Sequence, residues 1–183
     1  EPDMTTLGKV IGGGMPIGAV AGREEVMRVY DSSQGKAMCS HSGTFAGNPV
    51  SMAAGIAAMK LLTPEAIERL NQLGERARAG IREAFRLADI DGQVTGEGSL
   101  ILMHFSSEAL GNYRATWRAH TERRAEMLED LFRRLLNRGV LFSTWGLGCL
   151  STAMGEAEVD HLAEAVLASL KEMKEENGKA MAS

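Results

Sequence analysis

Three long segments of helical periodicity dominate the second part of the chain and constrain its fold. The first opens at a Thr63-Pro64 cap signal, and the others cover about residues 114–138, ending at Gly139, and 159–173. Apolar residues recur in them every three or four positions: Ile67, Leu70, Leu73, Ala77, Ile81 and Phe85; Leu128, Leu131, Phe132 and Leu135; and Val159, Leu162, Ala163, Val166, Leu167, Leu170 and Met173. Such stripes are typical of amphipathic helices that bury one face.

Short strand-like segments lie between these helices. Residues 94–105 predict one strand or two, after a Gly96-Glu97-Gly98 turn, and residues 140–142 and 149–153 predict two more. The resulting order is helix, strand, helix, strand, strand, helix, which is typical of a compact α+β domain. We predict that this domain covers residues 66–175 and that a polar tail follows at 176–183.

The first 65 residues predict a different organisation. They contain a short buried strand at 17–22, a short helix at 23–30, a long polar loop at 31–47 and a helix capped by Asn48-Pro49. The small and apolar residues Met52, Ala53, Ile56, Ala57 and Met59 predict that this helix is packed. We interpret residues 1–65 as the last strand and helices of a larger α/β sheet. Because a chemically loaded motif follows Glu1 almost at once, we expect the chain to be a fragment.

Composition argues against several classes of function. The 183 residues carry a net charge of -4 with acids and bases interspersed, so neither nucleic acid nor an anionic membrane is an expected partner. Cys39 and Cys149 form no Cys-x-x-Cys pair, and the four histidines lack metal-ligand spacing. No apolar run approaches the roughly 20 residues that span a bilayer, and the start does not read as a signal peptide. We expect a cytoplasmic protein without a metal site.

A lone lysine among glycines carries most of the chemical information. Residues 7–19 read Leu-Gly-Lys-Val-Ile-Gly-Gly-Gly-Met-Pro-Ile-Gly-Ala, with the lysine at position 9. A lysine amine attacks a carbonyl when it is unprotonated, and partial burial or a nearby cation favours that form. The glycines allow tight turns and the close approach of a planar molecule. Ile17 breaks a dinucleotide fingerprint, and Lys9 precedes the glycines, unlike a P-loop lysine. A solvated lysine beside a turn is the simpler alternative.

The extended pattern resembles the cofactor-lysine segment of class III aminotransferases, especially the subgroup that includes glutamate-1-semialdehyde aminomutase. Pro2-Asp3 through Ala19, and Gly22, match that segment. The resemblance implies a pyridoxal-phosphate (PLP)-dependent transferase of fold type I. In that case residues 1–65 end its PLP-binding large domain, and residues 66–175 form its small α+β carboxyl-terminal domain. It also implies that Lys9 forms a Schiff base with the cofactor, in a hollow that side chains leave open.

A second motif, His-Ser-Gly-Thr-Phe-Ala-Gly-Asn-Pro at 41–49, leads into the helix that Asn48 caps. Free backbone N–H groups and a hydroxyl at such a place suit an anion, although alone the motif is only a capped helix start. The same family carries a Gly-Thr-x-x-Gly-Asn-Pro signature here. The resemblance implies that Thr44, with Gly43, contacts the cofactor phosphate of the neighbouring subunit, so that a homodimer shares its sites.

The implied function is amino-group transfer, by an aminotransferase or a 2,1-aminomutase, on a small amino acid or amino aldehyde. In the family, an earlier strand supplies the carboxylate beside the pyridine nitrogen, and the ring-stacking residues also precede this part. None can be identified here, so we expect the isolated chain to be inactive. Two alternatives stay open: a non-catalytic remnant that serves as a dimerisation or binding module with Lys9 unused, and a module that binds an anion without covalent chemistry.

Overall fold

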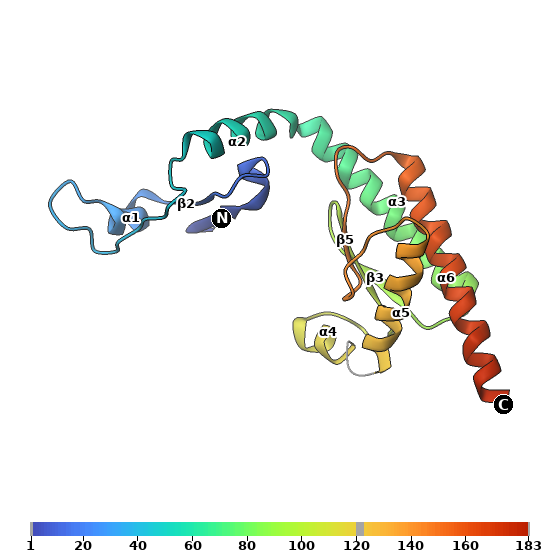
Figure 1. The fold of residues 1–183 in the computed structure, drawn as a ribbon. Coiled ribbons are helices and arrows are strands. Elements are labelled where there is room, and N and C mark those ends of the chain that lie inside the picture. The colour runs from blue at the N-terminus through green and yellow to red at the C-terminus, as the bar shows by residue number, and fades with distance from the viewer. Residues whose placement is uncertain (1, 120–122, 183) are drawn as a thin grey trace. The chain divides into compact units, whose positions relative to one another are not determined.

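The computed structural model describes residues 2–119 and 123–182, and the chain divides into two compact units, Glu1–Glu65 and Ala66–Ser183 (Figure 1). We call them unit 1 and unit 2 and describe each by itself. The boundary coincides with the division that the sequence predicts at residue 65. Whether the units correspond to the end of a large domain and a small carboxyl-terminal domain stays a prediction.

Unit 1 is built on a two-stranded hairpin. Strand β1 (Met4–Gly8) pairs antiparallel with β2 (Gly18–Gly22), with Gly8 opposite Gly18, and the short 3-10 helix η1 (Lys9–Gly12) begins the connection. The predicted strand is confirmed as β2, but its burial is wrong, because all its residues are exposed or half-buried. Two strands form a single narrow layer, and no second sheet covers them among the described residues of unit 1. Strand β1 is not predicted from the sequence.

The rest of unit 1 follows the predicted order. Helix α1 (Glu24–Met27) continues as the 3-10 helix η2 (Arg28–Tyr30), residues 31–48 form neither helix nor strand, and α2 covers Pro49–Leu61. Asn48 caps α2 as predicted, since its Oδ1 accepts hydrogen bonds from the backbone N–H groups of Val50 and Ser51 at 3.0 and 3.1 Å.

The predicted packing of α2 is wrong. The five residues expected to pack, Met52, Ala53, Ile56, Ala57 and Met59, are all exposed. The buried residues of the helix are instead Ser51 and Gly55. The reason is steric: α2 lies against η1, where only the smallest residues allow two backbones to approach this closely.

Unit 2 combines long helices with a three-stranded antiparallel sheet of order β3-β4-β5. The strands are short: β3 (Gln93–Thr95), β4 (Leu100–His104) and β5 (Leu147–Cys149). The helices are α3 (Pro64–Ala88), which starts just before the unit boundary, α4 (Tyr113–Ala119), α5 (Arg123–Asn137) and α6 (Glu156–Ala182). Residues 94–105 thus hold two strands around a turn, one of the two predicted arrangements.

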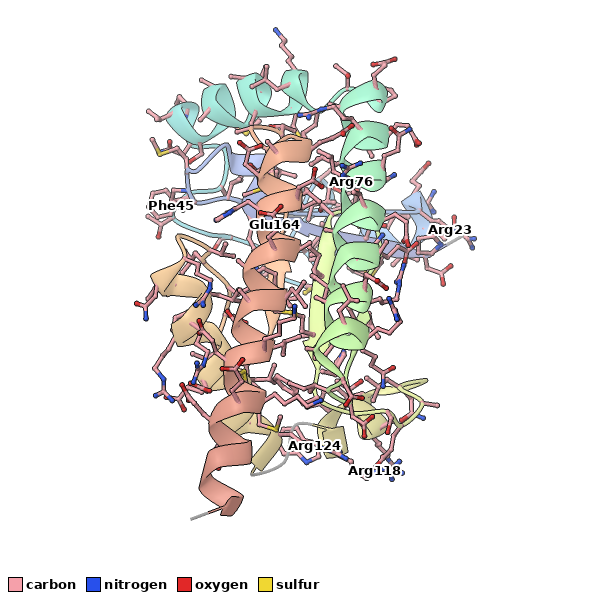
Figure 2. All side chains as sticks on the ribbon, turned by 90° about the vertical axis from the view of Figure 1, so that its right-hand side faces the viewer. Arg23, Phe45, Arg76, Arg118, Arg124 and Glu164 are labelled. Carbon is pink, nitrogen blue, oxygen red and sulfur yellow. The ribbon has the colours of Figure 1, made fainter. Side chains whose placement is uncertain are left out.

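The core of unit 2 comes from the apolar stripes that the sequence predicts. Side chains at most a few per cent exposed include Ile81 and Phe85 from α3, Leu131 and Leu135 from α5, and Val166 and Leu170 from α6, packed with Ile101 and Met103 of β4. Helices α3 and α6 run side by side, and Arg76, labelled in Figure 2, joins them through two hydrogen bonds of 2.8 Å to the Asp160 carboxylate.

Three local predictions for unit 2 need correction. The segment 140–142 is not a strand, and of the predicted strand 149–153 only Cys149 belongs to β5. Leu150 N–H still donates to the Ser99 carbonyl, but a turn closed by Met154 N–H on the Ser151 carbonyl then ends the pairing. The predicted helix 114–138 is described as α4 and α5, and residues 120–122 lie outside the described residues. Helix α6 continues to Ala182 through the segment predicted as a polar tail.

Neither a membrane span nor a metal cluster stands out in the described ranges. No single helix there has both the length and the apolar character to cross a bilayer, although α2 and α3 taken together pass by length and composition alone. Histidine, cysteine and carboxylate side chains form no group of three that could hold a metal ion within residues 2–119 and 123–182.

Candidate functional site

Lys9 stands at the point where β1 ends and the hairpin connection begins. Its φ angle is +53°, in the left-handed region that residues with a side chain rarely adopt. Asp89 is the one other non-glycine residue with a positive φ among the described residues. Such a conformation costs on the order of 1–3 kcal/mol and persists only where the surroundings impose it. The backbone at Lys9 is therefore held by its neighbours.

Helix α2 supplies that support. A Cβ added at Gly55 would lie 2.2 Å from the carbonyl oxygen of Ile11, and one added at Gly13 would lie 2.3 Å from the carbonyl oxygen of Ala54. Both distances are far below a normal contact, so the helix and the turn after Lys9 touch backbone to backbone. Gly13, at φ +58°, also donates its N–H to the Val10 carbonyl at 3.1 Å. The glycines thus serve close packing as well as turning.

The space beside Lys9 is open. A Cβ added at Gly8 or at Gly14 would meet no atom within 4 Å. The Lys9 side chain itself is exposed, and its amine has no hydrogen-bond or ion-pair partner among the described residues. The partial burial expected from the sequence is therefore not found in this chain, because no element of the described unit 1 covers the end of β1. The absence of bulky neighbours, by contrast, agrees with the expectation.

The loop before α2 contains two consecutive turns, and Gly43 and Thr44 lie in the first. Ala46 N–H bonds to the Gly43 carbonyl at 2.9 Å, and Asn48 N–H bonds to the Phe45 carbonyl at 3.1 Å. Gly43 and Thr44 are exposed, as is Phe45, which Figure 2 labels. The first amides of α2 are less free than the sequence suggests, because Asn48 accepts from two of them. An anion at this place would have to use the loop itself.

A hollow of about 410 Å³ lies between this loop and the hairpin. Its lining comes from two segments, Pro16–Val20 with Leu7 on one side and His41–Ala46 on the other. Gly43 and Thr44 belong to the lining, whereas Lys9 does not. The structure thus places the second motif beside β2 and does not bring it into a common hollow with the Lys9 of its own chain.

Residues of the loop that precede Gly43 are held against η2. Cys39 N–H donates to the Val29 carbonyl at 2.8 Å, and the His41 ring contacts the Tyr30 ring edge-on at 5.4 Å. At the loop's beginning, the Ser33 backbone N–H donates to Asp31 at 2.8 Å and holds the pKa of that carboxyl below its usual value. These contacts are not predictable from the sequence, because backbone hydrogen bonds in a loop leave no periodic signal.

Ser51 is a further residue that the sequence did not single out. It is 2% exposed, and its hydroxyl donates to the Pro16 carbonyl at 3.0 Å, between α2 and the end of the connection that starts at Lys9. A serine among small helix residues gives no sign of such a contact. Its burial and its distant partner emerge only from the fold.

Comparisons with known proteins cover almost the whole chain. Residues 1–173 match the family model for class III aminotransferases. The chain is 38% identical over 175 residues to a glutamate-1-semialdehyde 2,1-aminomutase of Akkermansia muciniphila, which covers 94% of this chain and 39% of that protein. It is 40% identical over 171 residues to a β-phenylalanine transaminase of Variovorax paradoxus, covering 90% and 37%.

A solved structure shows the same fold. An ω-transaminase from Sphaerobacter thermophilus superposes with a TM-score of 0.87 and 42% sequence identity, over 93% of this chain and 38% of that one. A further transaminase structure with PLP bound gives a TM-score of 0.80 at 45% identity, over 94% of this chain and 38% of that chain. The chain therefore spans about two fifths of the length of the proteins it matches.

Proposed function

Because the chain belongs to the class III aminotransferase family, whose members depend on pyridoxal phosphate, we propose that it serves amino-group transfer with this cofactor held covalently by Lys9. The mixed α/β fold is that of the PLP-dependent transaminases. The assignment of unit 1 to the end of a large domain of fold type I, and of unit 2 to a small carboxyl-terminal domain, belongs to the proposal.

The observation that carries the proposal is the backbone at Lys9. Lys9 has a left-handed backbone conformation at the end of a strand, and the glycine contacts with α2 hold the turn that follows it. The Lys9 Cα, from which the side chain extends, therefore has a fixed position. A Cβ at Gly8 or at Gly14 would meet no atom within 4 Å, so bulky groups do not crowd the backbone at these two glycines of the Lys9 segment. Strain of this kind collects at functional sites. A solvated lysine without a role would need none of it.

Each part of the site then has a defined task. Bound pyridoxal phosphate supplies the electron sink for the chemistry at the substrate carbon. The Lys9 amine would hold the cofactor through its aldehyde carbon and, once a substrate amine has taken that place, would serve as the base that moves a proton at the substrate Cα. Its four-carbon stem lets the nitrogen travel between these positions while the backbone stays fixed.

The Thr44 hydroxyl and the Gly43 backbone are proposed to contact the cofactor phosphate of a second copy in a homodimer. Their exposure, and a lining of the hollow that excludes Lys9 of the same chain, support this division of labour. The proposed substrate is a small amino acid or amino aldehyde, used in the cytoplasm. The names of the relatives include both a transaminase and a 2,1-aminomutase, so either reaction fits.

One experiment tests the role of Lys9. The protein is incubated with PLP, reduced with borohydride and mapped by peptide mass spectrometry. We expect a pyridoxyl group on Lys9 in clear excess over Lys60, an exposed lysine on α2 of the same unit. The excess should disappear in Lys9→Ala and fall in Thr44→Val, which removes a phosphate donor but keeps the shape of the side chain.

Equal modification of Lys9 and Lys60 would contradict the proposal. It would favour the non-catalytic binding module, for which the exposure of Lys9 is the supporting observation.

A further inference from the structure

Among the described residues of unit 1, Ser51 is the one with a buried polar side chain. Its hydroxyl reaches the carbonyl of Pro16, 35 residues earlier in the chain, at 3.0 Å. Its backbone N–H donates to the Asn48 side chain at 3.1 Å. Ser51 therefore contacts both sequence motifs, since Pro16 belongs to the Lys9 segment and Asn48 closes the Gly43–Thr44 loop.

The Pro16 carbonyl lies near the far end of the connection that begins at Lys9. The hairpin holds the two ends of this connection together, because Gly8 pairs with Gly18. The middle is fixed by close backbone contacts with α2, which join Gly13 to Ala54 and Ile11 to Gly55. The serine hydroxyl adds the one side-chain hydrogen bond between this connection and the helix that the structure describes. Steric contacts stop the connection and α2 from coming closer, whereas a hydrogen bond also opposes their separation. Ser51 therefore holds the turn against the helix.

We propose that Ser51 is a positioning residue for Lys9, which ties the turn that presents the amine to the capped start of α2. The chemical part of this inference rests on the proposed function, whereas its structural part does not. A site built without bulky side chains cannot use a hydrophobic core to hold its geometry, so a buried hydroxyl takes that task. The same residue also contacts Asn48, at the end of the Gly43–Thr44 loop.

Amide hydrogen exchange tests the structural part. The Gly13 and Met15 amides donate within the turn, to the Val10 and Gly12 carbonyls at 3.1 and 3.0 Å. In Ser51→Ala, loss of the hydroxyl should speed their exchange roughly five-fold, the effect of losing one ordinary hydrogen bond. Exchange at the wild-type rate would overturn the inference.

Ser169→Ala is the matched control. Ser169 is also fully buried in a helix, but its hydroxyl donates to Ala165 of its own helix α6, in unit 2, at 2.7 Å. The same chemical change therefore removes a hydrogen bond that has no connection with Lys9. We expect this variant to leave exchange at Gly13 and Met15 unchanged. An equal acceleration in both variants would show a general loss of stability and would also overturn the inference.

Reductive labelling with PLP tests the chemical part. The quantity measured is the ratio of pyridoxyl on Lys9 to pyridoxyl on Lys60 across a range of pH. Both lysines are exposed in the folded chain, so a change in the ratio does not come from a change in accessibility, and Ser169→Ala controls for a general loss of stability. We expect it to fall several-fold in Ser51→Ala and to stay constant in Ser169→Ala.

The outcomes separate the two proposals. An excess on Lys9 that is the same in wild type and in Ser51→Ala supports the proposed function and rejects the role of Ser51. If wild type shows no excess on Lys9, the proposed function fails. Amide exchange then decides by itself whether Ser51 holds the turn after Lys9 against α2.

Discussion

The two units of the chain are held together by different means. Unit 2 buries large apolar side chains from three helices and a sheet. In unit 1 the buried residues are Gly12, Ser51 and Gly55, within the residues that the structure describes. Several of its large apolar side chains, such as Ile56 and Met59, are exposed. One unit therefore rests on buried apolar area, and the other on close backbone contacts and a few hydrogen bonds.

The apolar core and the candidate site thus lie in different parts of the chain, and the difference has a physical reason. Burial of apolar area is the main source of stability, at about 25 cal/mol per Å². A place that must admit a planar molecule next to an amine has to keep side chains away, which removes that source. Unit 1 carries the candidate chemistry and little core, whereas unit 2 carries the core. Matched substitutions in the two units test this contrast.

The largest effect is expected from two isoleucines in helices. Ile81 in α3 is 0% exposed, and Ile56 in α2 is 54% exposed. Ile81→Ala should lower the free energy of unfolding by about 2–5 kcal/mol, because it leaves a cavity in the core. Ile56→Ala should change it by less than about 0.5 kcal/mol. Urea denaturation followed by circular dichroism measures both. A comparable loss for Ile56→Ala would mean that this face of α2 is buried in solution.

The sequence predicted the elements of unit 2 better than those of unit 1. Stripes of large apolar residues identify α3, α5 and α6, because burying them is what stabilises those helices. The Asn48 cap was also predictable, since a cap depends on neighbours in the chain. The buried face of α2 was not, because Ser51 and Gly55 are small and carry no hydrophobic signal. Strand β1 was missed for a similar reason: Thr5 and Thr6 break the apolar pattern of a short segment.

The candidate site was predictable only in part. Lys9, Gly43 and Thr44 follow from motifs whose residues are close in sequence, and their roles stay predictions. The Ser51 hydroxyl and the exposure of Lys9 were not predictable, because they depend on which distant segments meet. The buried Arg78 of unit 2 is a similar case, since it donates to the carbonyls of Gly98 and Leu100. A buried polar group with a distant partner has no local signature.

A second pair of substitutions compares helix glycines pressed against a carbonyl. A Cβ at Gly55 would lie 2.2 Å from Ile11 O in unit 1, and one at Gly74 would lie 1.8 Å from Gly98 O in unit 2. Overpacking of this kind costs about 1–3 kcal/mol. Gly74→Ala should therefore lower the unfolding midpoint of the whole core. Gly55→Ala should instead speed amide exchange at Gly13 and leave that midpoint nearly unchanged, because the core is elsewhere.

Gly111→Ala is the control for the glycine pair, because a Cβ there meets no atom within 4 Å. Its effect on stability should stay within about 0.5 kcal/mol. If Gly55→Ala lowered the global midpoint as much as Gly74→Ala, the stability of the two units would be coupled, and the contrast between them would be lost.

The smallest effect concerns carboxylates held in different ways. In unit 2, Arg138 donates to Glu172 at 2.6 Å and holds the pKa of Glu172 below its ordinary 4.5. In unit 1, a backbone N–H holds the pKa of Asp31 below its ordinary 3.8. The pKa of each group is lower in the folded chain than in the unfolded chain. Each carboxylate therefore stabilises its unit at pH values above its unfolded pKa. That stabilisation is lost as pH falls through the folded pKa.

Salt separates the two carboxylates. The Glu172–Arg138 pair is about half exposed on the Glu172 side, so ions can screen it, whereas the Asp31 bond to Ser33 is a short local hydrogen bond. Raising salt to about 1 M, where the screening length is about 3 Å, should move the pKa of Glu172 up toward its ordinary value and leave that of Asp31 nearly unchanged. Carboxyl NMR titration measures both in one sample. Equal movement of the two values would mean that Asp31 is also held by charge, and that unit 1 relies on more than its backbone contacts.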